Sequence, residues 1–441
     1  MRKSSILIVV LVLVALITTS CSSKTGSIGN EEGDARSADK KVKIEYWHVN
    51  SDTQGGQTVE ELVKRFNEKN AHIEVIAVYN PDMYKGLMQN LQAEASSGNP
   101  PAVVQVGWAF LDYFSNNFEY VTPQKIIDNY CPEDKDFLKD NFLENVLNLS
   151  KNSKGENAGI AYSLSTPVLY YNKDIFKEAG LPEKGPETWE QVIDYAKIIK
   201  QKTGNYGIYI QEPADFWAQQ AILESNGARM LTNKDGKIRA SFASQEGIEA
   251  FTAYADMVLK DKSALHISWD EGMQSFASGD IGMAYTTIAR RASIQEQAKF
   301  DVGAVKSPVW EGKERAVPAG GCFLAITAKD EEQQKAAWEF MKFLYSIESM
   351  AEWTIGTGYV PPRKNVAEAE DGLKNFLKEN ELMTPAIEQM NNVRQWASFP
   401  GDAGLIAEQK LLDMREQILN GTISPEEVMK KTQDEINELL E

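Results

Sequence analysis

Cysteine is scarce in this chain of 441 residues, which contains only Cys21, Cys131 and Cys322. Three cysteines do not make a disulfide framework. We interpret Cys131 and Cys322 as small core residues. Whether they pair depends on the fold and stays open from the sequence. The scarcity excludes the class of small scaffolds held together by disulfides.

Histidine is equally scarce, and His48, His72 and His266 do not stand at the spacing of metal ligands. The chain has no His-Glu-x-x-His, Gly-x-Ser-x-Gly or Gly-x-x-x-x-Gly-Lys motif. The 64 carboxylates do not by themselves indicate a glycosidase, because some pair lies close in any fold. The sequence therefore predicts no enzyme, no cofactor and no metal.

Positive charge is also in deficit. Lys and Arg number 46 against 64 Asp and Glu, which gives a net charge of −18. Nucleic acid is excluded as a partner, because phosphate backbones are held by Lys and Arg. An anionic ligand is disfavoured, although a local basic pocket can override the global sign. A hydrophobic fraction of 42% is normal for a globular chain of two to three domains.

Long hydrophobic runs are absent except at the start, where Ile6 to Ile17 follow a short basic head. This run is shorter than the roughly 20 residues of a membrane-spanning helix and suits a signal peptide. Thr18-Thr-Ser-Cys21 then resembles a bacterial lipoprotein signal, with Thr18 where Leu is usual. We expect Cys21 to be lipidated; an ordinary signal peptide cut nearby is the alternative.

The next segment, 22–41, is rich in Ser, Gly and charge and has almost no apolar residue. Such a segment cannot bury enough surface to fold. We interpret it as a flexible tether with a root-mean-square reach of roughly 25 Å. Together, residues 1–41 predict a protein anchored by lipid at the extracellular face of the cytoplasmic membrane.

The body begins with alternating apolar patterns. Strand-like runs at 42–47, 73–78 and 102–106 alternate with helical spacing at 58–69 and 83–95. This βαβαβ order predicts an α/β fold with parallel strands flanked by helices. Ligands bind at the carboxyl ends of such strands, where Trp47, Tyr79 and Trp108 stand.

Later segments carry clear start and stop signals. Capping boxes are predicted at Thr188, Ser268 and Ser424, and Gly279 is predicted to end the helix that begins after Ser268. The turn 233–236 predicts a β-hairpin. It vaguely resembles a calcium loop, but it lacks the required ligand series.

Four stretches together resemble one protein family and span nearly the whole chain after the tether. They are Tyr46-Trp-His48 with Arg65-Phe-Asn-Glu-Lys-Asn70; Ser165-Thr-Pro-Val-Leu-Tyr-Tyr-Asn-Lys-Asp174 with Phe176, Ala179-Gly-Leu181 and Thr188-Trp189; Ala316-Val-Pro-Ala-Gly-Gly321; and Glu352-Trp353 with Thr357-Gly-Tyr-Val-Pro361. The chain resembles the family 1 extracellular solute-binding proteins of ABC importers, which include maltose-type and glycerol-3-phosphate-type receptors.

The resemblance implies a type II periplasmic-binding-protein fold, with two lobes around a ligand cleft and a mainly parallel sheet in each. The first lobe would comprise 42–164 and 318–347, and the second 165–317 and 348–441. The chain would cross between lobes near Ser165 and near residues 319–321, where small residues can absorb hinge rotation. The implied partner is an ABC permease, and the receptor is expected to be a monomer.

The resemblance also implies ligand-binding positions. Those carried over from the glycerol-3-phosphate pattern are Tyr84, Ser165, the hydroxyl of Thr287, Gly320 and Tyr359. We add three tryptophans from their aromatic character and their places near strand ends or loops, Trp47, Trp217 and Trp396. Trp108 is included because it stands at a strand end and at the position of a ligand-binding carboxylate in that pattern. Trp189 and Trp353 stand on helices among apolar neighbours and are expected to pack in the core.

Two departures from the glycerol-3-phosphate pattern bear on the ligand. Trp108 replaces a carboxylate, and Phe399 replaces the arginine that holds phosphate; Arg363 or Arg394 could substitute for it. The site thus lacks a planar bidentate donor for phosphate and has aromatic rings instead. This favours a neutral sugar or oligosaccharide as the ligand. The alternatives are a phosphorylated polyol and, more remotely, a lipid-anchored glycoside hydrolase.

Overall fold

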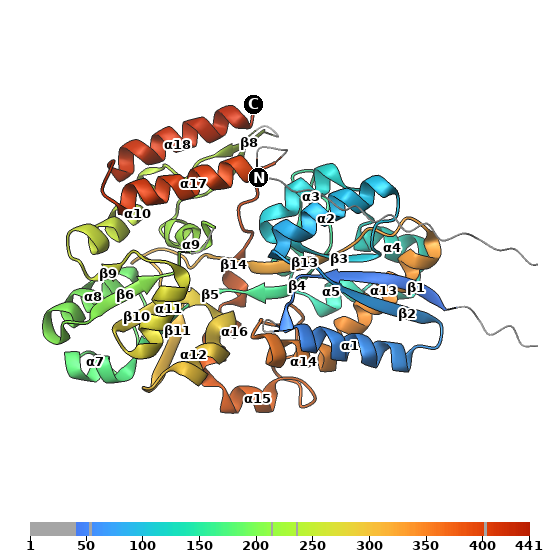
Figure 1. Ribbon diagram of the computed structural model, residues 1–441, viewed down its shortest axis with the longest axis horizontal. Helices are drawn as coiled ribbons and strands as arrows, with labels where there is room; N and C mark the ends of the chain where they lie inside the picture. The colour runs from blue at the N-terminus through green and yellow to red at the C-terminus, as the bar shows by residue number, and fades with distance from the viewer. Residues whose placement is uncertain (1–40, 53–54, 213–214, 235–236, 401–403) are drawn as a thin grey trace, which may run out of the picture. The chain divides into compact units, whose positions relative to one another are not determined.

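The computed structural model describes residues 41–52, 55–212, 215–234, 237–400 and 404–441 (Figure 1). The predicted signal peptide, the lipidated Cys21 and the tether up to residue 40 lie outside the described residues. No helix in the described part of the chain is long and apolar enough to cross a membrane. Residues 41–441 form one compact unit.

The first sheet contains the predicted βαβαβ unit. Its strands, in spatial order, are β2 (Ile73–Tyr79), β1 (Val42–His48), β3 (Val103–Gly107), β13 (Gly320–Ile326) and β4 (Ile160–Ser165). β1 pairs in parallel with β2 and β3, as the alternating pattern predicts. β13 runs antiparallel to β3 and β4.

The second sheet repeats this mixture of directions. Its order is β11 (Val302–Lys306), β5 (Pro167–Asn172), β10 (Ile281–Thr287), β6 (Tyr206–Ile210) and β9 (Ala264–Leu265). β6 is parallel to β10 and β9, whereas β5 is antiparallel to β10 and β11. Half of the pairings in each sheet are thus antiparallel, where mainly parallel sheets were expected. The reason is that β13 and β5 each enter their sheet from the other one and run back along it.

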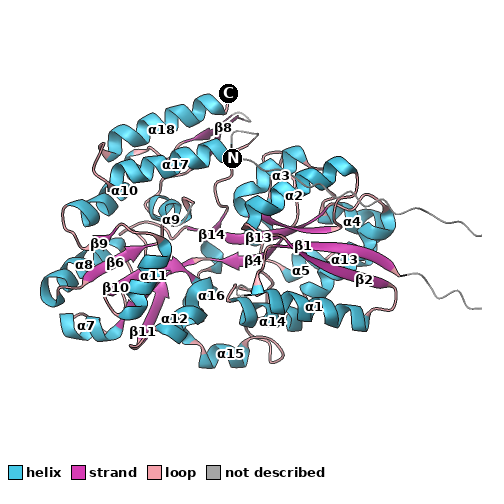
Figure 2. Cartoon of the chain, viewed as in Figure 1, coloured by secondary structure: helices cyan, strands magenta, loops and turns pink. Residues whose placement is uncertain are grey.

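Helices cover both sheets, as Figure 2 shows. In chain order they are α1 (Gly56–Lys69), α2 (Met83–Ser97), α3 (Leu111–Asn117), α4 (Pro123–Tyr130), α5 (Phe137–Asn141), α6 (Glu144–Leu147), α7 (Lys173–Ala179), α8 (Trp189–Thr203), α9 (Trp217–Ser225), α10 (Gln245–Leu259), α11 (Trp269–Ser278), α12 (Arg291–Gln297), α13 (Glu331–Leu344), α14 (Ile347–Thr357), α15 (Lys374–Glu379), α16 (Thr384–Glu388), α17 (Gly404–Leu419) and α18 (Pro425–Leu439).

All three predicted helix starts have their N-cap hydrogen bond, but the reciprocal bond of a capping box is present at Ser268 alone among them. Ser268 and Glu271 form a complete capping box at the start of α11, which ends at Gly279 in the left-handed conformation. The hydroxyls of Thr188 and Ser424 accept backbone N–H groups at the starts of α8 and α18. The predicted hairpin is present as β7 (Leu231–Lys234) and β8 (Lys237–Ala240), paired antiparallel.

The cysteines and helix tryptophans behave as packing residues. Cys131 and Cys322 are buried and unpaired with each other. Trp189 is 1% exposed, and Trp353 is fully buried and stacks on Tyr162 of β4 with ring centroids 4.6 Å apart. These observations agree with the expectation of core roles for all four side chains.

Helix α14 differs from the expected lobe boundary. The sequence assigns residues from 348 onward to the second lobe. α14 instead packs beside α1 and α13 on the first sheet, and Arg65 of α1 forms an ion pair with Glu352. The physical reason is the apolar face of α14, because Trp353 completes the core under β4.

Three short segments join the two sheets. β4 runs into β5 through Thr166, and β12 (Val317–Pro318) runs into β13. The third, β14 (Val393–Arg394), pairs in parallel with β12 and was not anticipated. Beside it, the Gln389 amide donates to the Thr166 hydroxyl and to the Pro167 carbonyl, both at 2.8 Å. These contacts fasten the third segment to the first.

Gly321 is the position in these segments with the tightest demand for glycine. Its φ is +98°, and a Cβ there would stand 2.1 Å from the Ser163 carbonyl oxygen. We predict that Gly321→Ala destabilises the protein by about 2 kcal/mol or more. Gly98→Ala is the matched control, because Gly98 has φ +91° and no atom within 4 Å of a Cβ. It should cost about 1 kcal/mol in chemical denaturation; equal losses would contradict the steric argument.

Candidate functional site

The predicted residue Gly320 stands where several other predicted residues meet. It pairs with Ser165 across β13 and β4. Its carbonyl oxygen accepts the indole N–H of Trp108 at 3.2 Å. A Cβ at Gly320 would lie 2.3 Å from the Ser165 hydroxyl oxygen and 3.2 Å from the Trp217 ring. Only glycine lets the serine and the Trp217 ring approach this strand so closely.

Trp217 and Trp396 extend this group towards the second sheet. Trp217 begins α9 and donates its indole N–H to the Pro318 carbonyl oxygen at 3.0 Å. Its ring centroid is 6.3 Å from that of the half-buried Trp396. We call Trp108, Ser165, Trp217, Gly320 and Trp396 the crossing cluster. Its members come from the first sheet, from the turn after β3, from α9 and from the segment that follows β14.

Tyr84 and Tyr359 form a second group beside the same strands. The Tyr84 ring lies against Gly107 at the end of β3, where a Cβ would be 2.5 Å from the ring. Burial raises the pKa of Tyr359 to about 12, against a smaller lowering by its hydrogen bond with Tyr84. The Tyr84 pKa is also raised, mainly by burial. Both hydroxyls therefore remain protonated at neutral pH and can donate hydrogen bonds.

The Tyr359 ring is positioned from behind by α14. It stacks on Trp353 with centroids 6.2 Å apart and an interplanar angle of 5°. The thiol of Cys322, two residues after Gly320, lies beside the tyrosine pair as a hydrogen-bonding partner of Tyr84. Strand β13 thus connects the tyrosine pair to the crossing cluster.

Thr287 and Trp47 take different places. Thr287 ends β10, pairs with Pro167 at the crossing, and accepts the Ala289 N–H with its hydroxyl. A Cβ on Gly358 would lie 3.2 Å from the Ala289 carbonyl oxygen, so the loop before Tyr359 approaches this strand end. Trp47 is buried in the core of the first sheet and donates its indole N–H to Glu45 of its own strand.

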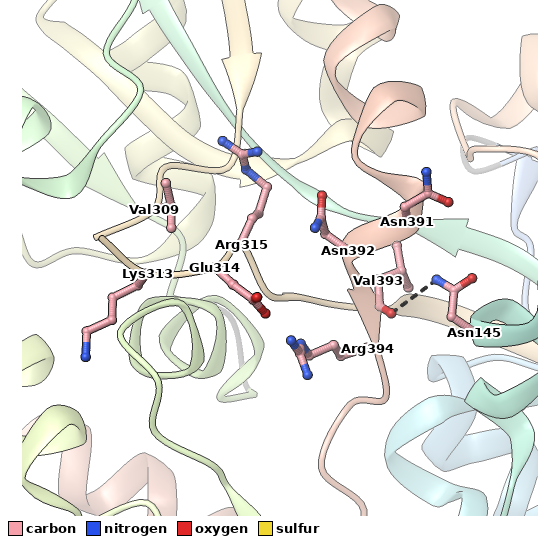
Figure 3. A pocket seen from close by; sticks show the side chains of 9 residues that line it. All are labelled: Asn145, Val309, Lys313, Glu314, Arg315, Asn391, Asn392, Val393 and Arg394. Atoms are coloured by element: carbon pink, nitrogen blue, oxygen red, sulfur yellow. Dashed lines mark hydrogen bonds between the residues drawn. The ribbon is translucent and has the colours of Figure 1, made fainter. Parts of the chain in front are cut away.

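The crossing cluster contains no charged side chain. Phe399, at the position of the phosphate-binding arginine in the resemblance, is 3% exposed and packs in the core. Arg363 donates to the Tyr345 carbonyl oxygen. Arg394 lines two cavities beside β14 (Figure 3). Trp108 and Trp217 are buried, at 1% and 3% exposed, and Trp396 is half-buried. The cluster therefore consists of aromatic rings, a hydroxyl and backbone carbonyls instead of a charge clamp.

The two cavities have volumes of about 590 Å³ and 620 Å³ and share Asn145, Val393 and Arg394. In the smaller one, Glu314 and Arg394 face the same space, and Asn145 donates to the Val393 carbonyl oxygen (Figure 3). The larger one includes Trp396 of the crossing cluster and side chains from both sides of the crossing. Its polar and charged lining consists of Asp112, Asn145, Asn148, Lys151, Asn152, Ser153, Gln220, Glu224, Arg229, Thr232, Asn233, Arg394, Gln395 and Ser398.

Gln220 of α9 is a contributor that the sequence did not indicate. Its amide donates to the Gln395 carbonyl oxygen and accepts the Ala397 N–H, both at 3.1 Å. Gln220 thereby fixes the backbone on both sides of Trp396. No sequence signal could reveal this contact, because its partners are about 175 residues away and glutamine is a common helix residue.

Two groups of side chains among the described residues have the composition of metal ligands. They are Cys131 with Glu133 and Asp134, and Glu212 with His266 and Glu416. The sequence predicts no metal, because the members of the second group are far apart in the chain.

Known proteins resemble this chain in sequence and in fold. A sequence profile described as "Bacterial extracellular solute-binding protein" matches residues 61–385, about three quarters of the chain. The sn-glycerol-3-phosphate-binding periplasmic protein UgpB of Escherichia coli K12 is 28% identical over 368 residues, covering 79% of this chain and 80% of the relative.

Two solved structures share the fold at lower identity. The cyclic α-maltosyl-1,6-maltose binding protein of Arthrobacter globiformis has a TM-score of 0.79 at 20% identity, covering 91% of this chain and 99% of its own. UgpB of Mycobacterium tuberculosis, in complex with glycerophosphocholine, has a TM-score of 0.77 at 21% identity, covering 91% and 98%. The fold is thus the two-lobed type II binding-protein fold that the sequence predicts.

The contact between Tyr84 and Gly107 can be tested by a double-mutant cycle. Gly107→Ala places a methyl group against the Tyr84 ring and should destabilise the protein by about 1–3 kcal/mol. In the Tyr84→Ala background the same change should cost much less, which gives a favourable coupling energy. Denaturant titration of the four proteins measures it. Additive losses would show that the ring does not depend on Gly107.

Proposed function

Because the chain belongs to the bacterial extracellular solute-binding proteins, we propose that it captures a neutral sugar or oligosaccharide and delivers it to the permease of an ABC importer. The observation that supports the sugar is the crossing cluster. Three tryptophans converge there on Gly320 and Pro318, and no charged side chain belongs to the group.

The chemistry of sugars fits this set of groups. A sugar ring presents apolar C–H faces and a belt of hydroxyls, so it requires flat aromatic surfaces and a few placed polar groups. The half-buried Trp396 ring would supply such a surface, and the buried Trp108 and Trp217 rings would do so once lobe opening uncovers them. The hydroxyls of Tyr84, Tyr359, Ser165 and Thr287 supply the polar groups. The Arthrobacter neighbour, which is named for binding a cyclic maltosyl-maltose, is consistent with this proposal.

The proposed mechanism is capture by lobe closure. The first lobe would comprise 42–164 and 318–347, to which the packing of α14 adds residues up to 357, and the second lobe the remainder. Tyr84 and Trp108 would meet the ligand from the first lobe, and Trp217 and Thr287 from the second. A ligand that contacts both favours the closed state by its differential affinity. A micromolar affinity, about −8 kcal/mol, is sufficient for a strong bias.

The remaining parts of the proposal concern location and partners. Cys21 is proposed to carry the lipid that anchors the chain outside the cytoplasmic membrane, with 22–41 as the tether. The receptor is proposed to act as a monomer, without nucleic acid and without catalysis. The family is one of solute-binding proteins and not of enzymes, which supports the non-catalytic role.

A phosphorylated polyol is the second candidate ligand. It is favoured by the Escherichia coli relative, whose name states that it binds sn-glycerol-3-phosphate. Phe399 disfavours it, because it is buried and cannot donate to a phosphate oxygen. The two candidates therefore differ in whether a cationic donor must reach the ligand.

We predict that a sugar or oligosaccharide in a binding panel raises the melting temperature in a concentration-dependent manner without product formation. Trp108→Ala should weaken the affinity by about tenfold or more, because it removes an aromatic face and the hydrogen bond to Gly320. Trp269→Ala, on α11 and outside the crossing cluster, is the matched control and should leave the affinity unchanged. Absence of any shift across mono- and oligosaccharides would refute the sugar assignment.

Phosphate esters provide the opposing test. We expect sn-glycerol-3-phosphate and glycerophosphocholine to produce no shift at millimolar concentration, because the arginine position is Phe399. Calorimetry with both compounds measures this directly. Saturable binding that is lost in Arg394→Gln or Arg363→Gln would favour the phosphorylated-polyol receptor instead.

A further inference from the structure

Three side chains from separate elements meet around His266. Glu212 follows β6, His266 follows β9, and Glu416 belongs to α17. The Nδ1 atom of His266 is 2.6 Å from Oε2 of Glu212, and its Nε2 atom is 3.2 Å from Oε2 of Glu416. The two ring nitrogens thus face two different carboxylates.

Glu212 is itself held firmly. Its side chain is 3% exposed and accepts the hydroxyl of Tyr254 from α10, and its backbone N–H donates to the Tyr209 hydroxyl. A carboxylate fixed in this way accepts Nδ1–H of His266. The hydrogen bond to Glu212 raises the pKa of His266, so a zinc ion at Nε2 must displace the proton that otherwise faces Glu416. This carboxylate–histidine arrangement is the one that orients histidine ligands in metal sites.

The distance between Nε2 of His266 and the Glu416 oxygen is suitable for two atoms that bind the same zinc ion. Zinc binds histidine nitrogen at about 2.0–2.1 Å and carboxylate oxygen at about 2.0–2.2 Å. With these lengths, a separation of 3.2 Å corresponds to an angle of roughly 100° at the metal, close to tetrahedral. Glu416 is about half exposed, which leaves a path for the ion and for water ligands.

The surroundings carry more negative than positive charge. Burial raises the pKa of Asp215 to about 6, and burial together with Asp215 raises that of Glu408 to about 7. Arg415 is the cation that contacts this region, through the Asp215 carbonyl oxygen and the Glu416 carboxylate. Raised pKa values favour the uncharged form of Asp215 and Glu408, so the negative charge that a divalent cation would offset is that of the two carboxylates beside His266, Glu212 and Glu416.

We infer that His266 Nε2 and the Glu416 carboxylate bind a zinc ion, with Glu212 orienting the histidine and water completing the coordination. Imidazole together with carboxylate favours zinc over calcium or magnesium, which prefer oxygen ligands only. The ion would tie α17 to the segment between β9 and α11. This inference stands independently of the proposed sugar ligand.

The other group of potential ligands is less suited to an ion. Asp134 already accepts the Lys342 ammonium at 2.8 Å and the Trp338 indole N–H at 2.7 Å. Burial raises the pKa of the Cys131 thiol, which opposes formation of the thiolate that zinc requires. Cys131 nevertheless defines a necessary control, because any free thiol can bind zinc.

Zinc calorimetry on the purified full-length protein tests the inference. The wild type should bind one equivalent through this site, and Cys131→Ser should retain it. His266→Gln and Glu416→Gln should each weaken the affinity more than about tenfold, and Glu212→Gln by about 10–100-fold through the lost orientation of the ring. His72→Gln, at an exposed histidine, is the matched control and should have no effect.

A second measurement distinguishes zinc bound at Nε2 of His266 from a proton bound at the same atom. Nitrogen NMR of His266 should show Nδ1 protonated and Nε2 shifted on zinc addition at pH 7.5. The inference is overturned if zinc binding is abolished by Cys131→Ser, or is unchanged in His266→Gln. It is also overturned if the wild type binds no zinc and both nitrogens stay protonated at pH 7.5, which would make the group an imidazolium bridging two carboxylates.

Discussion

The lack of a side chain at Gly320 is the constraint on which the meeting of the two sheets depends. Any Cβ there would collide with the Ser165 hydroxyl and touch the Trp217 ring. Because the position is open, the Trp217 ring can approach Gly320 while it donates to the Pro318 carbonyl oxygen of β12, and Trp108 donates to the carbonyl oxygen of Gly320 itself. The aromatic faces are thereby fixed by the backbone of the crossing strands, so motion at the crossing must also move the rings.

The segment around β14 also holds the two sheets together. The backbone around Trp396 is fixed by Gln220 of α9, and that of residues 389–390 is tied to the first crossing by Gln389. Ser398 then contacts the backbone of Ala109 and Asp112 at the start of α3. A single stretch of chain therefore contacts elements of both sheets. Rotation of one sheet against the other must be absorbed within this stretch as well as in the two covalent crossings.

The parts that the sequence predicts are those with local signals. Strand and helix periodicity placed the βαβαβ unit, and the Ser268–Glu271 pair placed a helix start to the residue. Pairings between distant segments have no such signal. The antiparallel entry of β13, the packing of α14 on α1 and the link from Gln220 to Gln395 all depend on tertiary contacts. Tyr84, Ser165, Gly320 and Tyr359 came from a family resemblance, and periodicity alone could not have singled them out.

Two different environments lie on either side of the start of α9, one uncharged and one rich in carboxylates. On one side lies the uncharged crossing cluster, in a chain whose net charge is −18. On the other lie the carboxylates around Arg415. Asp215 joins them, because its carboxylate accepts the Trp217 N–H at 3.1 Å while its carbonyl oxygen accepts Arg415. Phe216, between them, donates its N–H to Glu408. The backbone N–H groups at the start of α9 are therefore held by carboxylates of this group, while the Trp217 ring donates to the crossing at Pro318.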